Sequence, residues 1–418
     1  MNALKVDPAW PPSRHRRNVR PMPGPLLFLL AQVAAPALPP PPPSSPAATP
    51  SDEVIVIGRR AEKELAACLA RRCPPAEDVE ASLQASVEQF ADARYTDALR
   101  TLQRAVGRNK RHAAQLPGPV SSLYATMATV AEHEGLDRIW RNAARHNVEV
   151  LRAHVGTTNA ATLTQELQLA DDLLALDMPG AAAGIYKKVA QRGRDTGQPA
   201  MAANATFRQA WVALMRGQFR AAGRLADESV AVAGPAQPAM NELRAILRMR
   251  IAVQKGDGGA VDALAARQRQ SARRSPALLY APDLKDINPS RAFQGSNGGD
   301  GSGVQWADIG YWIRPDGRTA DVELLRSNGL GAWKPSILTF VGARRYIPLD
   351  LQATDPGLYR IDRFTIRSPF QIIVGSHLPV RAGPATVHVV DLTGTDAMSE
   401  AHRTRVARAQ GSPPASRP

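Results

Sequence analysis

The sequence has few of the residues that build metal or catalytic sites. Among its 418 residues are 2 cysteines and 8 histidines. The cysteines, Cys68 and Cys73, have no second cysteine pair and no neighbouring histidine to complete the four ligands of a structural zinc site. We therefore expect neither a bound metal nor another cofactor.

Familiar catalytic motifs are also missing. The patterns H-E-x-x-H, G-x-S-x-G and G-x-x-x-x-G-K-[ST] do not occur, and no G-x-G-x-x-G follows a strand. His133, His146 and His154 lie in helical stretches without carboxylates at ligand spacing, and Asp171-Asp172 is typical of a helix surface. We therefore expect that the protein is not an enzyme.

Lysine is scarce, although the formal net charge is +14. Only 8 of the 52 basic residues are lysine, and the arginines are spread along the chain without a run interleaved with aromatic residues. Phosphate binding needs clustered cations. The composition therefore argues against a nucleic-acid partner.

The apolar run at residues 25–38 (PLLFLLAQVAAPAL) follows several arginines and ends in small residues. This pattern predicts that residues 1–38, or those from an alternative start at Met22, are a signal peptide for export to the periplasm. A fourteen-residue helix spans about 21 Å, less than the roughly 30 Å of a hydrocarbon core. The alternative is an uncleaved anchor in the inner membrane.

In an exported protein, a disulfide between Cys68 and Cys73 is the expected state of the cysteines. Residues five apart on one helix point in different directions, so the bond requires the helix to end, as Pro74 allows. Two free thiols are the alternative.

Residues 39–80 are predicted to be a proline-rich linker with one short strand. Pro39 to Pro43 are consecutive prolines, typical of a polyproline II spacer. The β-prone stretch DEVIVIGRR follows at residues 52–60.

Residues 81–274 have the periodicity of helices. Apolar residues recur three, four or seven positions apart, as at Leu83, Val87 and Phe90 or at Leu163, Leu167 and Leu174. Turns recur roughly every 40 residues, which indicates stacked helical hairpins.

Two pieces of this region resemble tetratricopeptide repeats. In each, an aromatic residue after the turn is followed by alanine and leucine: Tyr95, Ala98 and Leu99, and then Phe219, Ala221 and Leu225. The resemblance implies an α-solenoid with a concave surface that binds proteins. The alternative is a helical spacer without a ligand.

A glycine-rich flexible linker (275–303) is expected to precede a second domain at residues 304–395, and residues 396–418 are expected to be a disordered tail. Alternating apolar residues on both sides of Asp316-Gly317 predict a β-hairpin. A short helix from about Trp333 and a strand at residues 358–368 follow. The fold class is therefore α+β in two domains.

This order of elements resembles the C-terminal domain of TonB-type energy transducers. The motifs that carry the resemblance are D-G at Asp316-Gly317, S-x-G at Ser327-Asn328-Gly329 and R-Y-x-P at Arg345, Tyr346 and Pro348. Arg344 stands where the family usually has tryptophan. The strand-like runs QIIVG and TVHVVDL in residues 370–392 extend beyond the family core.

The resemblance implies that the sheet binds an extended peptide by strand addition, in that family the box of a TonB-dependent outer-membrane receptor. The candidate edge is Tyr359 to Ile366, and the candidate contacts are Tyr346, Pro348, Tyr359, Ile361, Phe364 and Ile366. We therefore expect a periplasmic adaptor protein. The alternatives are a membrane-anchored energy transducer and a periplasmic enzyme with an unrecognised site in residues 370–392.

The stretch at residues 52–60 resembles the box of such receptors. Its β-branched residues Val54, Ile55, Val56 and Ile57 could add to a sheet edge of this same chain, which would make the segment a self-docking strand. The alternative is a tether that leads into the first helix.

Overall fold

The chain is described by a computed structural model that covers residues 60–176, 178–235, 237–270, 276–282, 304–330, 333–367, 370–372, 379–381 and 386–393. The predicted signal peptide, the β-prone residues Val54 to Ile57 and the predicted tail lie outside the described residues.

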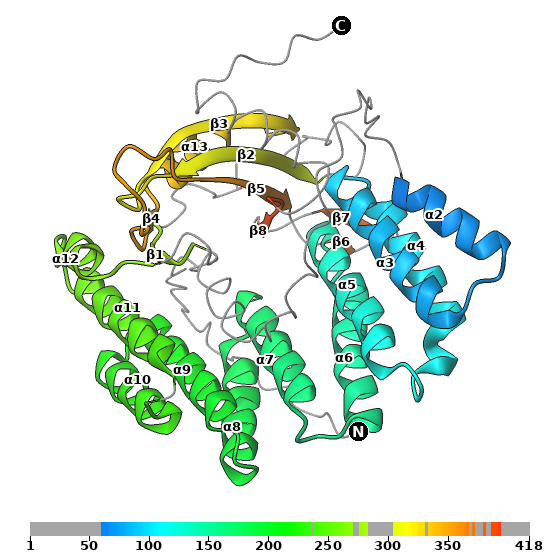
Figure 1. Ribbon diagram of the computed structural model, residues 1–418, viewed down its shortest axis with the longest axis horizontal. Coiled ribbons are helices and arrows are strands. Elements are labelled where there is room, and N and C mark those ends of the chain that lie inside the picture. Colours follow the sequence, from blue (N-terminus) through cyan, green and yellow to red (C-terminus); the bar gives the residue numbers. More distant parts are fainter. Residues whose placement is uncertain are drawn as a thin grey trace, which may run out of the picture.

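The chain has an α+β fold, with a helical N-terminal region followed by a small antiparallel sheet. The helices are α2 (Arg60–Ala70), α3 (Pro75–Ala91), α4 (Tyr95–Asn109), α5 (Pro117–Glu134), α6 (Asp137–His154), α7 (Ala160–Ala175), α8 (Pro179–Asp195), α9 (Pro199–Met215), α10 (Phe219–Ala233), α11 (Pro238–Gln254) and α12 (Ala260–Arg267), with the 3-10 turn η2 (Lys110–His112) after α4. They begin at Arg60, earlier than the predicted boundary at residue 81. Successive helices form an arc, and the sheet lies across its two ends (Figure 1).

Local sequence explains where many of these helices begin. Proline stands at the start of α3, α5, α8, α9 and α11. Its missing N–H costs nothing there, because the first N–H groups of a helix have no partner within it. Gly135 ends α5 in the left-handed conformation, with φ at 74°.

The buried faces of the helices follow the predicted stripes with one exception. Leu163, Leu167 and Leu174 are at most 2% exposed. Val87, by contrast, is 43% exposed. The buried face of α3 instead contains small and polar side chains, including Ser82, Ala85, Ser86 and Gln89. The prediction is therefore wrong for Val87 alone, because Phe90 is buried and Leu83 packs against the same cluster.

The sheet contains β2 (Gln305–Ile313), β3 (Thr319–Asn328), β5 (Leu358–Arg367) and β8 (Thr386–Asp391), in the order β3-β2-β5-β8. All neighbouring strands are antiparallel. Helix α13 (Trp333–Gly342) packs on one face, where the rings of Phe340 and Phe364 are 6.0 Å apart. The predicted hairpin turn at Asp316-Gly317 is confirmed.

Two short strand pairs accompany this sheet: β1 (Leu278–Tyr280) with β4 (Arg345–Tyr346), and β6 (Phe370–Ile372) with β7 (Pro379–Arg381). Strand β1 lies inside the segment that the sequence predicted to be a flexible linker. Its pairing with β4 instead ties this part of the segment to the C-terminal region.

The helices and the sheet share their hydrophobic cores. One cluster joins Leu123 and Trp140 of the helices to Trp312, Tyr359 and Ile361 of the sheet. The other extends from the later helices to α13 and the opposite face of the sheet. The two regions are therefore packed against each other rather than joined only by a linker.

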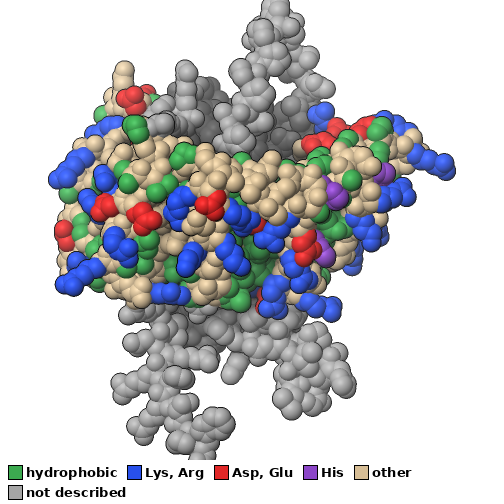
Figure 2. Space-filling model, turned by 90° about the horizontal axis from the view of Figure 1, so that it is seen from below, with side chains coloured by type: hydrophobic (Ala, Val, Ile, Leu, Met, Phe, Trp, Pro, Cys, Tyr) green, Lys and Arg blue, Asp and Glu red, His purple; other side chains and the backbone are tan. Residues whose placement is uncertain are grey.

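Among the described helices, none is both long and apolar enough to cross a bilayer. On the face of the arc opposite the sheet, lysine and arginine side chains are distributed across the whole width, with aspartate and glutamate between them (Figure 2). This distribution agrees with the dispersed arginines of the sequence.

Candidate interaction site at the sheet edge

Strand β5 is not an edge strand, contrary to the prediction from the family resemblance. It pairs with β2 on one side and with β8 on the other. Strand β8 comes from the run TVHVVDL, which extends beyond the family core. The chain therefore covers with its own extension most of the edge that was expected to receive a partner.

The six residues predicted to contact a partner are all buried in the described structure. Phe364 and Ile366 join the cluster that includes α13, whereas Tyr359 and Ile361 join the cluster that includes the first helices. Tyr346 and Pro348 lie in and just after β4. Their side chains hold the core together and are not presented to a partner at the surface.

The described sheet has β3 and β8 as its outer strands. Strand β3 is irregular, because its register with β2 shifts between Asp308 and Ile309 and again between Gly310 and Trp312. Asp321 also has a positive φ of 48°. Bulges twist an edge and interrupt its hydrogen-bonding groups, which discourages further pairing.

Strand β8 has a regular register with β5 over residues 386–391. The N–H of Leu392 donates to the carbonyl of Ile361 at 2.8 Å. Hydrogen-bonded pairs alternate along an antiparallel ladder. The N–H groups of Val387, Val389 and Asp391 therefore point away from β5, and no other described strand pairs with this edge.

The other face of β5 carries a row of polar side chains that meets the helices. We call the contacts of Arg363, Thr365 and Arg367 of β5, and of His388 of β8, with α3 and α5 the sheet–helix junction. Arg363 donates to both carboxylate oxygens of Asp308, at 2.7 and 2.9 Å. Burial lowers the pKa of the Arg363 guanidinium, but the hydrogen bond and charge of Asp308 outweigh this and raise it.

The same guanidinium caps the end of α3. Arg363 donates to the carbonyl oxygens of Phe90 and Ala91 at 2.6 and 2.7 Å. Arg326 of β3 also donates to Ala91 O and to Asp308, each at 2.5 Å. The last carbonyls of a helix lack partners within the helix and carry partial negative charge. The sheet therefore supplies the cations that complete the C-terminal end of α3.

Helix α5 is held to the sheet in a similar way. Arg367 donates to the carbonyl of Glu132 at 2.6 Å. Nδ1 of His133 lies 3.0 Å from Oγ1 of Thr365, and Nδ1 of His388 lies 3.1 Å from Oε1 of Glu132. The side chain of His133, one of the histidines that the sequence places in helical stretches, is buried in the structure at 4% exposure.

A second buried polar group lies on the α13 face of the sheet. Arg344 pairs with Asp362 at 2.5 Å and donates to the hydroxyls of Tyr311 and Tyr346 at 3.1 and 3.3 Å. Burial and the charge of Asp362 raise the pKa of Tyr311 well above its ordinary value, so the phenol remains neutral. Arg344, noted as a departure from the family pattern, is thus part of the core.

Asp171 is another residue whose position differs from the prediction. It is 2% exposed and forms an ion pair with Arg208 at 2.9 Å. The hydroxyl of Tyr186 also donates to it at 2.6 Å. It is therefore a buried structural contact and not part of a helix surface.

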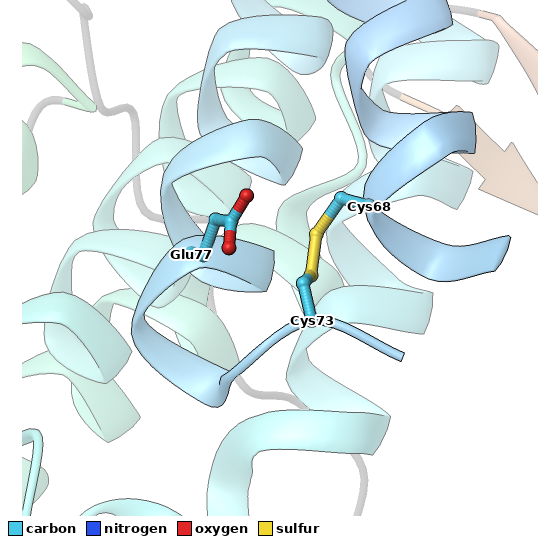
Figure 3. Close-up of side chains that lie close together, drawn as sticks. All are labelled: Cys68, Cys73 and Glu77. Carbon is cyan, nitrogen blue, oxygen red and sulfur yellow. A yellow bond between two sulfur atoms is a disulfide. The ribbon is translucent and has the colours of Figure 1, made fainter. Parts of the chain in front are cut away.

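The Cys68–Cys73 disulfide is present, with the two Cα atoms 5.1 Å apart. Helix α2 ends at Ala70, as the bond requires. The carboxylate of Glu77 lies nearby (Figure 3), and it forms an ion pair with Arg71. Sulfur atoms joined in a disulfide are not thiolate ligands, so this group does not form a metal site in the oxidised protein.

Comparison with known proteins assigns no family. No family model matches the chain, and no curated protein matches it. The resemblances to tetratricopeptide repeats and to TonB C-terminal domains stay predictions.

Proposed function

We propose that this protein is a protein-interaction adaptor of the cell envelope and that it adds an extended peptide of its partner to the outer edge of β8. The observation that carries this proposal is the regular register of β8, whereas β3 at the opposite edge of the sheet is bulged. Strand addition needs a row of N–H and C=O groups at regular spacing, which β8 provides over six residues.

The side chains of β8 also suit an added strand. Val387 and Val389 pack on the cluster that includes α13, and Val390 packs on the opposite cluster. A neighbouring strand would extend both apolar layers, because cross-strand contacts between β-branched residues stabilise sheets. The buried side chains of β5 would then act as the support for β8 and not as direct partner contacts.

The disulfide supports a location outside the cytoplasm. Such bonds persist in oxidising compartments, including the bacterial periplasm. Export through the apolar segment at residues 25–38 is consistent with that location, and the same segment left uncleaved would hold the adaptor at the inner membrane.

The test is a photo-cross-linking experiment in the native cells with the full chain. A photo-reactive residue replaces Val389, and Val387 is then changed to Pro or, as the matched control, to Ala. Proline removes an outward N–H that partner pairing needs but leaves the ladder to β5, whereas alanine keeps the N–H. We expect a defined protein adduct that Val387→Pro abolishes and Val387→Ala retains. Equal adduct yields in the two variants would contradict strand addition at β8.

A further inference from the structure

Two histidines from distant parts of the sequence meet in the sheet–helix junction. The ring of His133 in α5 lies edge-on to Phe90 with centroids 4.9 Å apart and is stacked on Tyr95 at 6.4 Å. The ring of His388 in β8 is 5.7 Å from it. Both imidazoles therefore lie where β5 and β8 press against the helices.

The charged groups that face His133 are mainly positive. Strand β5 contributes Arg363 and Arg367, and β8 contributes His388. Among the described residues, Nδ1 of His133 has one hydrogen-bond partner, the neutral hydroxyl of Thr365. A proton on His133 would thus add a third charge beside two buried guanidinium groups.

The acids of the neighbouring elements already have other partners. Asp308 of β2 is paired with Arg363 and Arg326. Glu132 of α5 contacts His388, and the carboxylate of Glu134 accepts a hydrogen bond from Thr96 at 2.7 Å. Within the described part of the chain, none of these contacts gives His133 a negative partner.

We propose that His133 makes the sheet–helix junction sensitive to pH, so that β5 and β8 are held against α5 at neutral pH and are released in mildly acidic solution. A buried imidazole beside cations is a common element of pH-sensitive interfaces, because histidine changes charge between pH 5 and 8.

The direction of the effect follows from the neutral state of His133. Burial holds its pKa well below the ordinary value, and the charges of His388, Arg367 and Arg363 lower it further. Release exposes the imidazole to water, where its pKa returns to about 6.5. The state in which β5 and β8 are held against α5 is therefore fully favoured above about pH 6.5. Below that pH, the equilibrium constant between the held and released states falls by at most about tenfold per pH unit.

One neighbouring group acts in the opposite direction. Burial and the nearby charge of Glu132 raise the pKa of Asp172 in α7 well above its ordinary value. A fall in pH therefore favours the state in which this carboxyl is buried. The contribution of His133 must therefore be isolated by substitution.

The test measures hydrogen exchange of the full chain at pH 7.5 and pH 5.5, corrected for the intrinsic exchange rates. His133→Asn places an uncharged amide near the Nδ1 position and removes the titration, with His133→Gln as a second variant if the first does not fold. His146→Asn is the matched control, because His146 is 49% exposed on α6 and contacts Glu149.

In the wild type and in His146→Asn, we expect protection of β8 to fall at least about fivefold between the two pH values, while α9 changes little. In His133→Asn, the fall should be less than about twofold. An equal fall in His133→Asn and wild type would overturn the proposal. A loss of protection in α9 equal to that in β8 would also overturn it, because it would indicate global unfolding. Unchanged protection of β8 in the wild type between the two pH values would overturn it as well.

Discussion

Arg363 and Asp308 form an ion pair in which neither side chain is accessible to solvent. The pair connects adjacent strands, since β2 and β5 place these two residues opposite each other. The remaining donors of the guanidinium reach the last carbonyls of α3. One arginine thus joins the sheet to the first helices, and the two parts of the chain should respond together to its loss.

We expect Arg363→Met to lower the free energy of unfolding by about 3–5 kcal/mol, because it leaves Asp308 buried without one of its cations and α3 without one of its two capping arginines. Urea denaturation followed by circular dichroism measures this. Arg100→Met is the matched control: Arg100 is 62% exposed and pairs with Asp97 at the surface, so its loss should cost less than about 1 kcal/mol. Equal losses would show that Arg363 does not hold the junction.

The buried arginines also mark the limit of prediction from the sequence. Apolar spacing located most helices, and the Asp316-Gly317 turn located the hairpin, because both signals are local. The strand Leu358–Arg367 was expected as well. The position of this strand between β2 and β8 was not predicted, because pairing between strands that are distant in the sequence depends on the whole fold.

Burial of polar residues is the other feature that pattern analysis missed. In β5, Arg363, Thr365 and Arg367 occupy alternate positions and so share one face of the strand. That spacing was visible in the sequence, but a polar face usually indicates solvent. Only the carbonyls at the ends of α3 and α5 explain why the face is buried. The buried side of α3 also includes polar residues, Ser82 and Gln89, and Ser82 is satisfied there by hydrogen bonds with Asp78 and Arg108.

Replacing both members of the buried Arg344–Asp362 pair should lower the free energy of unfolding less than replacing Arg344 alone. Arg344→Met alone leaves the carboxylate of Asp362 buried without its cation, and we expect a loss of about 3–5 kcal/mol in the free energy of unfolding. Adding Asp362→Leu removes that charge, so the double variant should recover at least half of the loss. Denaturation of the four proteins of this double-mutant cycle measures the coupling. A double variant as unstable as the sum of the single ones would rule out a direct interaction.

The disulfide should stabilise the chain modestly, because Cys68 and Cys73 enclose a short loop. Loop-closure entropy for so few residues corresponds to about 2 kcal/mol. We expect Cys68→Ala with Cys73→Ala to lower the free energy of unfolding by about that amount. A reducing agent should have the same effect on the wild type and none on the double variant. If the reductant changes neither protein, the cysteines are free thiols in solution.

The hairpin turn offers a direct comparison of two glycines. Gly317 has φ at 81°, and a Cβ at this position would collide with the backbone carbonyl of Tyr346. We expect Gly317→Ala to lower the free energy of unfolding by roughly 2 kcal/mol or more, through left-handed strain and displacement of β4. Gly184 lies within α8, and a Cβ there meets no atom within 4 Å.

Gly184→Ala should therefore raise the free energy of unfolding by roughly 0.5–1 kcal/mol, because alanine restricts the unfolded chain and favours the helix. Thermal and urea denaturation of the two variants under identical conditions measures both effects. Opposite signs are the expected outcome. A neutral Gly317→Ala would mean that the turn relaxes away from Tyr346 at no cost, and the close approach of the hairpin to β4 would then contribute nothing to the stability of the sheet.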